Sequence, residues 1–259
     1  MMMNILAIET TGKYGSAAVI RSDGSLFCAS SSEEMNHLKG MMILIDEAIK
    51  KAGISKKELT HIAASAGPGS FTGIRIGVVT ARTMAQMLGI PCIAVSSLEA
   101  MGIRVLSQAV EDGAVFVAPI INARRHQTYA AVYEAARGND GALTAAMEEK
   151  QYIIEDLLTA LNEKLAGTDS AKVFFTGDGI DAYRDIIEEM MPAGSYMLAD
   201  EEIRYQHAGS VAEAALRKAA ASETLGYNEL MPEYMRLAEA EQRLKSGTLS
   251  DKIRRPVQK

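Results

Sequence analysis

The sequence predicts an α/β protein made of two similar lobes with a cleft between them. The first observation is a repeat. Three strand-like segments, a helix, a strand and a helix occur twice, at a period of roughly 110 residues, which is too long for a solenoid. The second is composition, since 48% apolar and 23% charged side chains in 259 residues can build a sizeable core. We therefore expect lobes at residues 1–106 and 107–241 and a tail at residues 242–259.

The first lobe is predicted from alternating strand and helix signals. Asp23-Gly24 is typical of a hairpin turn between two strands. Ser31, with Glu34 three residues later, is a capping-box pattern that opens a helix, and Gly53 is suited to end it. The expected elements are strands at residues 4–9, 16–20 and 26–30, a helix at 33–52, a strand at 61–66, a helix at 72–88 and a strand at 92–95.

The helix expected at residues 33–52 carries two adjoining apolar stripes, although a helix that covers a sheet needs only one. The wide apolar face fits a helix buried deep in its own lobe. It equally fits a helix with one side on its sheet and the other side on a partner helix. The first stripe is Met35, Leu38, Met42, Ile45, Ile49 and Ala52, and the second is Met41, Leu44 and Ala48.

Small residues recur every four positions along the helix expected at residues 72–88, at Gly73, Gly77, Ala81 and Ala85. Such a stripe lets another helix approach closely. Each interior glycine costs roughly 1 kcal/mol relative to alanine, so close packing is the expected compensation.

The second lobe repeats the pattern and carries most of the negative charge. Net charges are +2 for residues 1–106, −13 for residues 107–241 and +5 for residues 242–259. An acidic lobe repels nucleic-acid phosphates, so any contact with RNA is expected through the tail. The expected elements are strands at residues 115–121 and 128–133, a third strand ending near 153, helices at 155–165, 179–190 and 210–221, and a strand at 172–176.

The segment from Gly67 to Gly73 joins a strand to a helix N-terminus, which is a form that can bind an anion. It has neither the P-loop ending nor the dinucleotide-binding pattern. The alternative is a tight turn in which Ser70 or Thr72 caps the helix. A two-lobed ATPase also needs carboxylates near both phosphate turns. Glu9 is available in the first lobe, but the matching turn offers Asn122, so efficient magnesium-ATP hydrolysis is not expected.

Other functional classes find little support in the sequence. His37 is followed four residues later by Met41, so the helix lacks a pair of metal-binding histidines. Cys28 and Cys92 form no C-x-x-C motif and fit a reducing cytosol. The longest apolar run, residues 114–121, is far shorter than the ~20 residues of a membrane span.

Five segments point together to one family. The most specific is Gly67-Pro68-Gly69-Ser70-Phe71-Thr72-Gly73-Ile74-Arg75-Ile76-Gly77. Weaker support comes from Asn4-Ile5-Leu6-Ala7-Ile8-Glu9-Thr10-Thr11, Val95-Ser96-Ser97-Leu98, Ala123-Arg124-Arg125 followed by Tyr129, and Pro232-Glu233-Tyr234-Met235-Arg236. In this order, and over nearly the whole chain, they resemble the TsaB (YeaZ) family.

The resemblance implies a two-lobed actin-like ATPase fold of the ribonuclease H-like type, with a duplicated β-β-β-α-β-α core and a reduced second lobe. It implies a cytoplasmic scaffold subunit without catalytic residues or a metal site. With a TsaD-like paralogue and a TsaE-like ATPase, it would be required for threonylcarbamoyl transfer to adenosine 37 of tRNAs that read codons beginning with A. It would need no cofactor of its own, ATP or ADP in the complex would be held mainly by the partners, and tRNA would be met at most indirectly.

The resemblance also implies where the partner binds. The helices at residues 33–52 and 72–88 would dock the TsaD-like paralogue, or a second copy of the chain in a homodimer, and helix 210–221 would pack back on the first lobe. The residues expected at or near the contact are Met35, Leu38, Met42, Ile45, Ile74, Arg75 and Val78. A remnant anion or nucleotide loop is expected at Glu9, Thr10, Thr11, Gly67, Gly69, Ser70 and Thr72.

Two departures from the family pattern count against nucleotide chemistry. Family members usually have Asp where this chain has Glu9, and often Asp where it has Asn122. Two alternative functions stay open. One is an independent two-lobed ATPase or small-molecule kinase. The other is a peptidase, after the older glycoprotease label of such proteins, for which the sequence shows no nucleophile or metal pair.

Overall fold

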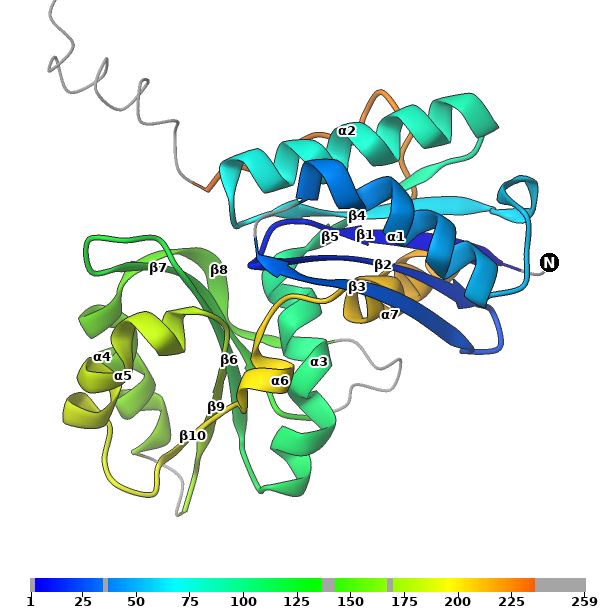
Figure 1. Cartoon of the computed structure of the whole chain (residues 1–259). Coiled ribbons are helices and arrows are strands. Elements are labelled where there is room, and N and C mark those ends of the chain that lie inside the picture. The colour runs from blue at the N-terminus through cyan, green and yellow to red at the C-terminus, as the bar shows by residue number, and fades with distance from the viewer. Residues whose placement is uncertain (1–2, 35–36, 137–142, 167–169, 236–259) are drawn as a thin grey trace, which may run out of the picture.

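The computed structural model describes residues 3–34, 37–136, 143–166 and 170–235, with residues 33, 34 and 37–39 described by their main chain alone. It has two lobes, each built on a five-stranded mixed sheet (Figure 1). The tail expected at residues 242–259 lies outside the described residues. In the described part of the chain, no helix combines the length and the apolar character that a membrane crossing requires.

The first sheet has the strand order β3-β2-β1-β4-β5. Its first three strands pair antiparallel, and β4 and β5 extend the sheet in parallel from β1. Strand β1 is buried on both faces, as its almost continuous apolar run predicts. The strands are β1 (Asn4–Glu9), β2 (Tyr14–Arg21), β3 (Leu26–Glu34), β4 (His61–Gly67) and β5 (Cys92–Ser96).

Helices α1 (His37–Lys51) and α2 (Phe71–Leu88) lie side by side over one face of this sheet (Figure 1). A short 3₁₀ turn, η1 (Lys56–Glu58), leads from α1 into β4. Both apolar stripes of α1 turn inward, with one described exception, Met42, which is 49% exposed. The wide apolar face of α1 therefore serves mainly the core of its own lobe.

The small-residue stripe of α2 also faces its own lobe, which corrects the expectation of a partner helix there. Gly73, Gly77, Ala81 and Ala85 are all buried. A Cβ on Gly73 would lie 1.9 Å from the carbonyl oxygen of Thr10. The stripe thus lets α2 approach the chain directly after β1.

The second sheet repeats the first, with the order β10-β9-β6-β7-β8. Strands β6, β7 and β8 pair antiparallel, and β9 and β10 follow in parallel. The predicted duplication is confirmed. The fifth strand of the first sheet is the one expected at residues 92–95, whereas β10 in the second sheet was not predicted. The elements are β6 (Phe116–Asn122), β7 (Gln127–Glu134), β8 (Ala145–Ile153), α4 (Ile154–Leu165), β9 (Val173–Thr176), α5 (Gly179–Met190), β10 (Tyr196–Leu198) and α6 (Glu201–Arg204).

The two remaining helices cross between the lobes. Helix α3 (Ser97–Glu111) follows the first sheet, but its Val105 and Ala109 pack into the core of the second lobe. Helix α7 (Ala208–Ala220) follows the second sheet and packs Val211 and Ala215 against the first. The lobe boundary expected after residue 106 therefore falls inside α3.

The segment after α7 runs back over the first lobe beside α2 (Figure 1). Leu225 pairs with Cys92 at the edge of β5, and Leu230 is completely buried in the first core. The amide of Glu233 donates to the carbonyl of Ala66, and Met235 packs on the cluster around Tyr133. We call residues 224–235 the C-terminal strap. The sequence predicted no helix or strand over these residues.

Candidate functional site: the interlobe cleft and the outer face of α1 and α2

A cleft of about 820 Å³ lies between the lobes. The first lobe contributes the turn after β1, residues 11–13, and the start of α2, residues 69–72. The second lobe contributes residues 121–124 after β6, together with Asp178, Asp181 and Tyr205. Of the loop residues predicted from the sequence, Thr11, Gly69, Ser70 and Thr72 line this cleft.

Glu9 lies under the cleft rather than in it, which corrects its predicted place in an anion loop. Its side chain is fully buried, and Oε1 accepts from the amide and the hydroxyl of Thr11. Oε2 accepts from the hydroxyl of Ser65 on β4. Burial raises the pKa of Glu9, although these hydrogen bonds oppose the shift. The carboxylate thus fixes the turn after β1, and its two oxygens are already occupied.

Thr10 and Gly67 are also structural rather than exposed to the cleft. Thr10 is buried, and its hydroxyl donates to the carbonyl of Gly73 at 2.7 Å. A Cβ on Gly67 would lie 2.3 Å from the carbonyl oxygen of Glu233 in the C-terminal strap. Both positions therefore hold the loop against its surroundings.

Ser70 caps α2, as one of the two interpretations of the loop predicted. Its Oγ accepts from the amide of Gly73 at 3.2 Å, and its own amide donates to the carbonyl of Thr11 at 2.8 Å. The loop is thereby fastened to the turn after β1. Because the same residue lines the cleft, the N-terminus of α2 opens toward it, which favours a ligand with negative charge.

The second lobe brings two carboxylates to the cleft. Burial raises the pKa of Asp178 to about 6, although its Oδ1 accepts from the amide of Asn122 at 3.0 Å. Asp181 forms an ion pair with Arg204 and accepts from the hydroxyl of Tyr205 at 2.8 Å. Both carboxylates already have protein partners.

Asn122 and the turn that follows it form the opposite wall of the cleft. Its Oδ1 accepts from the amide of Arg124 at 2.8 Å and from the hydroxyl of Tyr183 at 3.0 Å. Arg124, Arg125 and His126 all have φ between 54° and 64°, a left-handed turn that non-glycine residues seldom adopt.

Sequence reasoning missed Asp181 and Tyr205 as cleft residues. Neither belongs to a motif. Tyr205 lies directly after α6, in the connection that leads to α7, and this connection passes the cleft because α7 packs on the first lobe. The family resemblance implied that helix 210–221 packs on the first lobe, but it did not place Tyr205 in the cleft.

Three of the predicted contact residues face the interior, which corrects their assignment to a partner surface. Ile45, Ile74 and Val78 are at most 2% exposed and belong to the core of the first lobe. They lie on the stripes that cover the sheet, so no partner reaches them. Met35 lies outside the described residues, and so does the side chain of Leu38.

Arg75 is exposed but engaged within the chain. Its guanidinium stacks 4.1 Å from the ring centroid of Phe71, and its Nε donates to the hydroxyl of Tyr234 at 2.7 Å. The rings of Phe71 and Tyr234 stack at 4.6 Å. This side of α2 is therefore covered by the C-terminal strap.

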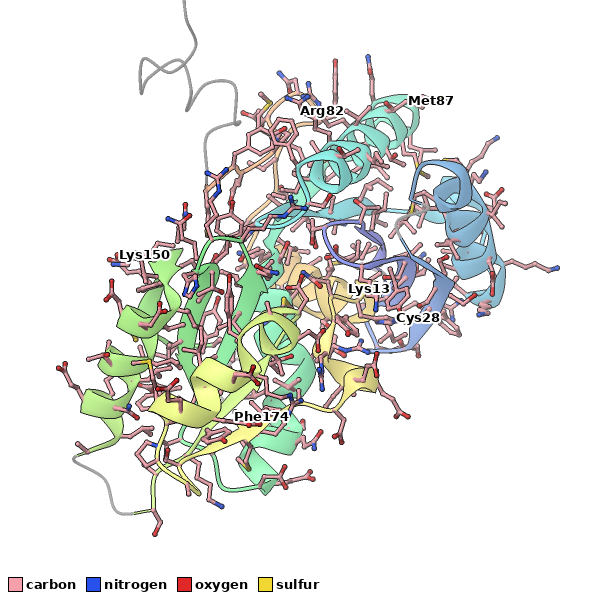
Figure 2. The ribbon with its side chains drawn as sticks, turned by 60° about the vertical axis from the view of Figure 1, so that its left-hand side comes forward. Lys13, Cys28, Arg82, Met87, Lys150 and Phe174 are labelled. Atoms are coloured by element: carbon pink, nitrogen blue, oxygen red, sulfur yellow. The ribbon has the colours of Figure 1, made fainter. Side chains whose placement is uncertain are left out.

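Apart from Phe71, which stacks on Tyr234, four large apolar side chains are exposed among the described side chains of α1 and α2, and we call these four the outer face. Met42 and Ile43 on α1 are 49% and 68% exposed, and Val79 and Met87 on α2 are 59% and 81% exposed. Met87 projects from the far end of α2 in Figure 2. Only Met42 was predicted. Ile43, Val79 and Met87 occupy helix positions between the apolar ones that the helical period buries. Their apolar side chains at such positions are the signal that could have identified them.

Met41, four residues after His37, does not face a possible metal site. Met41 is 2% exposed and packs in the first core, while the side chain of His37 lies outside the described residues. Among the side chains that the structure describes, no group of three His, Cys, Asp or Glu is placed to hold a metal ion.

Comparison with known proteins identifies the family from the sequence, and solved structures share the fold. The sequence model of the family described as TsaD, tRNA N6-adenosine threonylcarbamoyltransferase, matches residues 31–244. The tRNA threonylcarbamoyladenosine biosynthesis protein TsaB of Bacillus subtilis is 30% identical, over 92% of this chain and 96% of that protein. The TsaB protein of Escherichia coli is 25% identical, over 90% of this chain and 95% of that protein.

The solved structure of YeaZ from Pseudomonas aeruginosa has the same fold. It superposes with a TM-score of 0.73 at 24% identity, over 90% of this chain and 99% of that one. The similarity to TsaB of Bacillus subtilis and the match over residues 31–244 extend through both lobes. The chain therefore belongs to the TsaB (YeaZ) family.

Proposed function

We propose that this chain acts in tRNA threonylcarbamoyladenosine biosynthesis as a subunit without catalytic activity of its own, which docks a TsaD-like paralogue. The names of its relatives support the pathway. The observation that carries the docking role is the outer face, where four large apolar side chains are exposed on two adjacent helices. A TsaE-like ATPase would join this pair.

The outer face is suited to a stable interface because its two helices are rigidly held. The opposite sides of α1 and α2 are buried in the first core, so the exposed side chains are presented on a fixed surface. Burying apolar surface contributes about 25 cal/mol per Å². Exposed apolar groups that gather on one surface typically mark a site of protein association. A second copy of the chain could use the same face when the paralogue is absent.

The carboxylates near the cleft support a non-catalytic role. Glu9 is buried beneath the turn after β1, and Asp181 is paired with Arg204. A phosphoryl-transfer site needs carboxylates that are free to hold hydrated magnesium between the lobes. These two side chains instead hold the fold together.

Pairing between purified proteins tests the docking role. The chain and the TsaD-like paralogue of the same organism should co-elute in size-exclusion chromatography, and Val79→Glu should abolish co-elution. Val110→Glu is the matched control, since Val110 is also apolar and 44% exposed but lies on α3. Circular dichroism confirms folding of both variants. If Val79→Glu still co-elutes with the paralogue, the outer face is not the docking surface.

The cleft itself favours a second candidate, an independent ATPase or small-molecule kinase. The N-terminus of α2 opens into a space of about 820 Å³, which is large enough for a nucleotide. Magnesium-dependent ATP turnover by the purified chain, lost in Asp178→Asn, would support this candidate. Turnover that remains at the level of a buffer blank excludes it.

A further inference from the structure

The C-terminal strap is a third element in the layer that α1 and α2 form over the first sheet (Figure 1). Its Met231 contacts Arg82, and its Tyr234, three residues later, stacks on Phe71 at the start of α2. The strap therefore runs antiparallel to α2. Leu230 is completely buried in the same core that α1 and α2 cover. One face of the first sheet thus carries three neighbouring elements, α1, α2 and the strap.

Both charged residues of α2 are on the side of the helix that faces the strap. Arg75 Nε donates to the hydroxyl of Tyr234 at 2.7 Å, and Arg82 Nη1 donates to the sulfur of Met231 at 3.4 Å. At about 100° per residue, both arginines lie roughly 40–60° around the helix axis from Val79, on the opposite side from Met87. The strap therefore takes up the two cations, and the exposed ridge of α2 around Val79 carries no charge.

The strap holds Met231 in a fixed place on the outside of this layer. Leu230 points into the core, whereas Met231 is 57% exposed. Before them, the amide of Gly226 donates to Oε2 of Glu229 at 2.6 Å, which closes a turn. After them, the amide of Glu233 donates to a carbonyl of β4 at 2.7 Å. The main chain is thus fastened on both sides of Met231.

Exposed apolar side chains gather on these three elements. Of the eleven large apolar side chains that are exposed in the described part of the chain, eight lie on α1, α2 or the strap. The strap contributes Tyr227, Met231 and Tyr234. Exposed apolar groups that gather in this way mark a surface for association. The apolar surface of the outer face therefore continues onto the strap.

The two helices alone are small for a stable interface. Among the described side chains, six residues of α1 and seven of α2 are exposed. A standard interface uses about 20–30 residues and about 800 Å² on each partner. A partner docked on the outer face must therefore contact further elements. The strap lies directly beside α2 and offers an apolar side chain that is already held in place.

We propose that the C-terminal strap is the third element of the docking surface, and that Met231 contacts the same paralogue as the outer face. This inference rests on the proposed function. The partner surface opposite Val79 and Met231 is apolar, because neither side chain offers a charge or a hydrogen-bond donor. The strap also keeps the guanidinium groups of Arg75 and Arg82 turned toward itself and away from that apolar contact.

Titration calorimetry between the full chain and the purified paralogue tests the contact. Val79→Glu should abolish binding. Met231→Glu should raise the Kd about tenfold or more, because its carboxylate would be buried against an apolar surface. The control Val110→Glu, at an exposed apolar position on α3, should keep the wild-type Kd. Circular dichroism confirms that each variant is folded.

The outcomes separate this inference from the proposed function. If the wild-type chain does not bind the paralogue, the docking role fails and the role of the strap fails with it. If Val79→Glu abolishes binding while a folded Met231→Glu keeps the wild-type Kd, the outer face remains the docking surface and only the strap is excluded from it.

Photo-cross-linking tests the same contact without adding a charge. A photo-reactive phenylalanine derivative in place of Met231 should cross-link to the paralogue when the complex is irradiated, and mass spectrometry identifies the joined peptides. The same derivative in place of Val110 should give no cross-link to the paralogue. A complex that stays paired but gives no cross-link from position 231, or gives one only to a second copy of this chain, overturns the proposal.

Discussion

Ser96 at the start of α3 donates a 2.6 Å hydrogen bond to Glu149 on β8, and this bond joins the two lobes. The same Ser96 hydroxyl accepts from the amides of Leu98 and Glu99 as the N-cap of α3. Glu149 also accepts from the hydroxyl of Tyr133 at 2.6 Å. One serine therefore serves both the helix and the contact between the lobes.

Ser96→Ala should lower the free energy of unfolding by about 2 kcal/mol. Loss of an N-cap costs typically ~1 kcal/mol, and loss of a hydrogen bond to a charged group costs about 1.5–3 kcal/mol, with partial overlap between the two. Urea denaturation measures the change. Glu149→Gln keeps one side-chain oxygen that can accept from Ser96 or Tyr133. It should therefore lower the free energy of unfolding by less than Ser96→Ala does. A larger loss in Glu149→Gln contradicts the assignment of Ser96 as the cap of α3.

Gly73→Ala should destabilise the chain by a few kcal/mol. The added Cβ would meet the backbone oxygen of Thr10 at 1.9 Å, and backbone cannot move aside cheaply. Gly40→Ala on α1 is the control, because a Cβ there has no neighbour within 4 Å. It should stabilise the helix by roughly 0.5–1 kcal/mol. Thermal denaturation of the two variants gives opposite shifts if α2 packs on β1 as described.

Asp178→Asn should stabilise the chain at neutral pH by about 1–2 kcal/mol. The folded-state pKa of Asp178, about 6, lies above its ordinary value of 3.8. The folded state therefore holds this proton more tightly, and stability falls as pH rises between those values. The asparagine oxygen can still accept from Asn122. Chemical denaturation at pH 7 and near pH 3.5 tests this, because the free energies of unfolding of the wild type and of Asp178→Asn should converge at the lower pH.

His207 should act on stability in the opposite direction. Its folded-state pKa, about 4, lies below the ordinary 6.5, so the unfolded chain binds the proton first as pH falls. Stability from the neutral imidazole is complete above pH 6.5 and is lost as pH falls toward 4. His207→Asn, which can still cap α7, should flatten this acid limb in a plot of unfolding free energy against pH. An unchanged slope between pH 6.5 and 4 contradicts the burial of His207.

Leu230→Ala should cost about 2–4 kcal/mol, because Leu230 is fully buried in the first core. Met231→Ala is the neighbouring control, since Met231 is 57% exposed. It should change stability by less than about 0.5 kcal/mol. Equal effects of the two substitutions would show that the C-terminal strap is not part of the core.

The repeat in the sequence was enough to predict both sheets. Runs such as Ile5 to Ile8 have the buried character of central strands, and the order of strands and helices sets the topology. A locally coded cap marked the start of α2 at Ser70. The capping-box interpretation of Ser31 and Glu34 was wrong, because both residues lie in β3 and α1 begins only at His37. These features depend on neighbours in the chain.

Long-range packing was not predictable in the same way. The exchange of α3 and α7 between the lobes decides which lobe each helix serves, and nothing within either helix encodes it. Glu9 looked like a site carboxylate because it ends β1, but its hydrogen bond to Ser65 lies 56 residues away in sequence. Ile45 was correctly predicted to lie on an apolar stripe of α1. Which side of α1 faces outward depends on how the helix packs on the sheet beneath it, and this placed Ile45 in the core.

Complementation in cells tests the central claim most directly. Cells of the source organism depleted of this chain should lose threonylcarbamoyladenosine from tRNA, measured by mass spectrometry of tRNA nucleosides. Wild-type chain and Val110→Glu should restore the modification, and Val79→Glu should not. Persistence of the modification after depletion, or full restoration by Val79→Glu, would contradict a role that depends on the outer face.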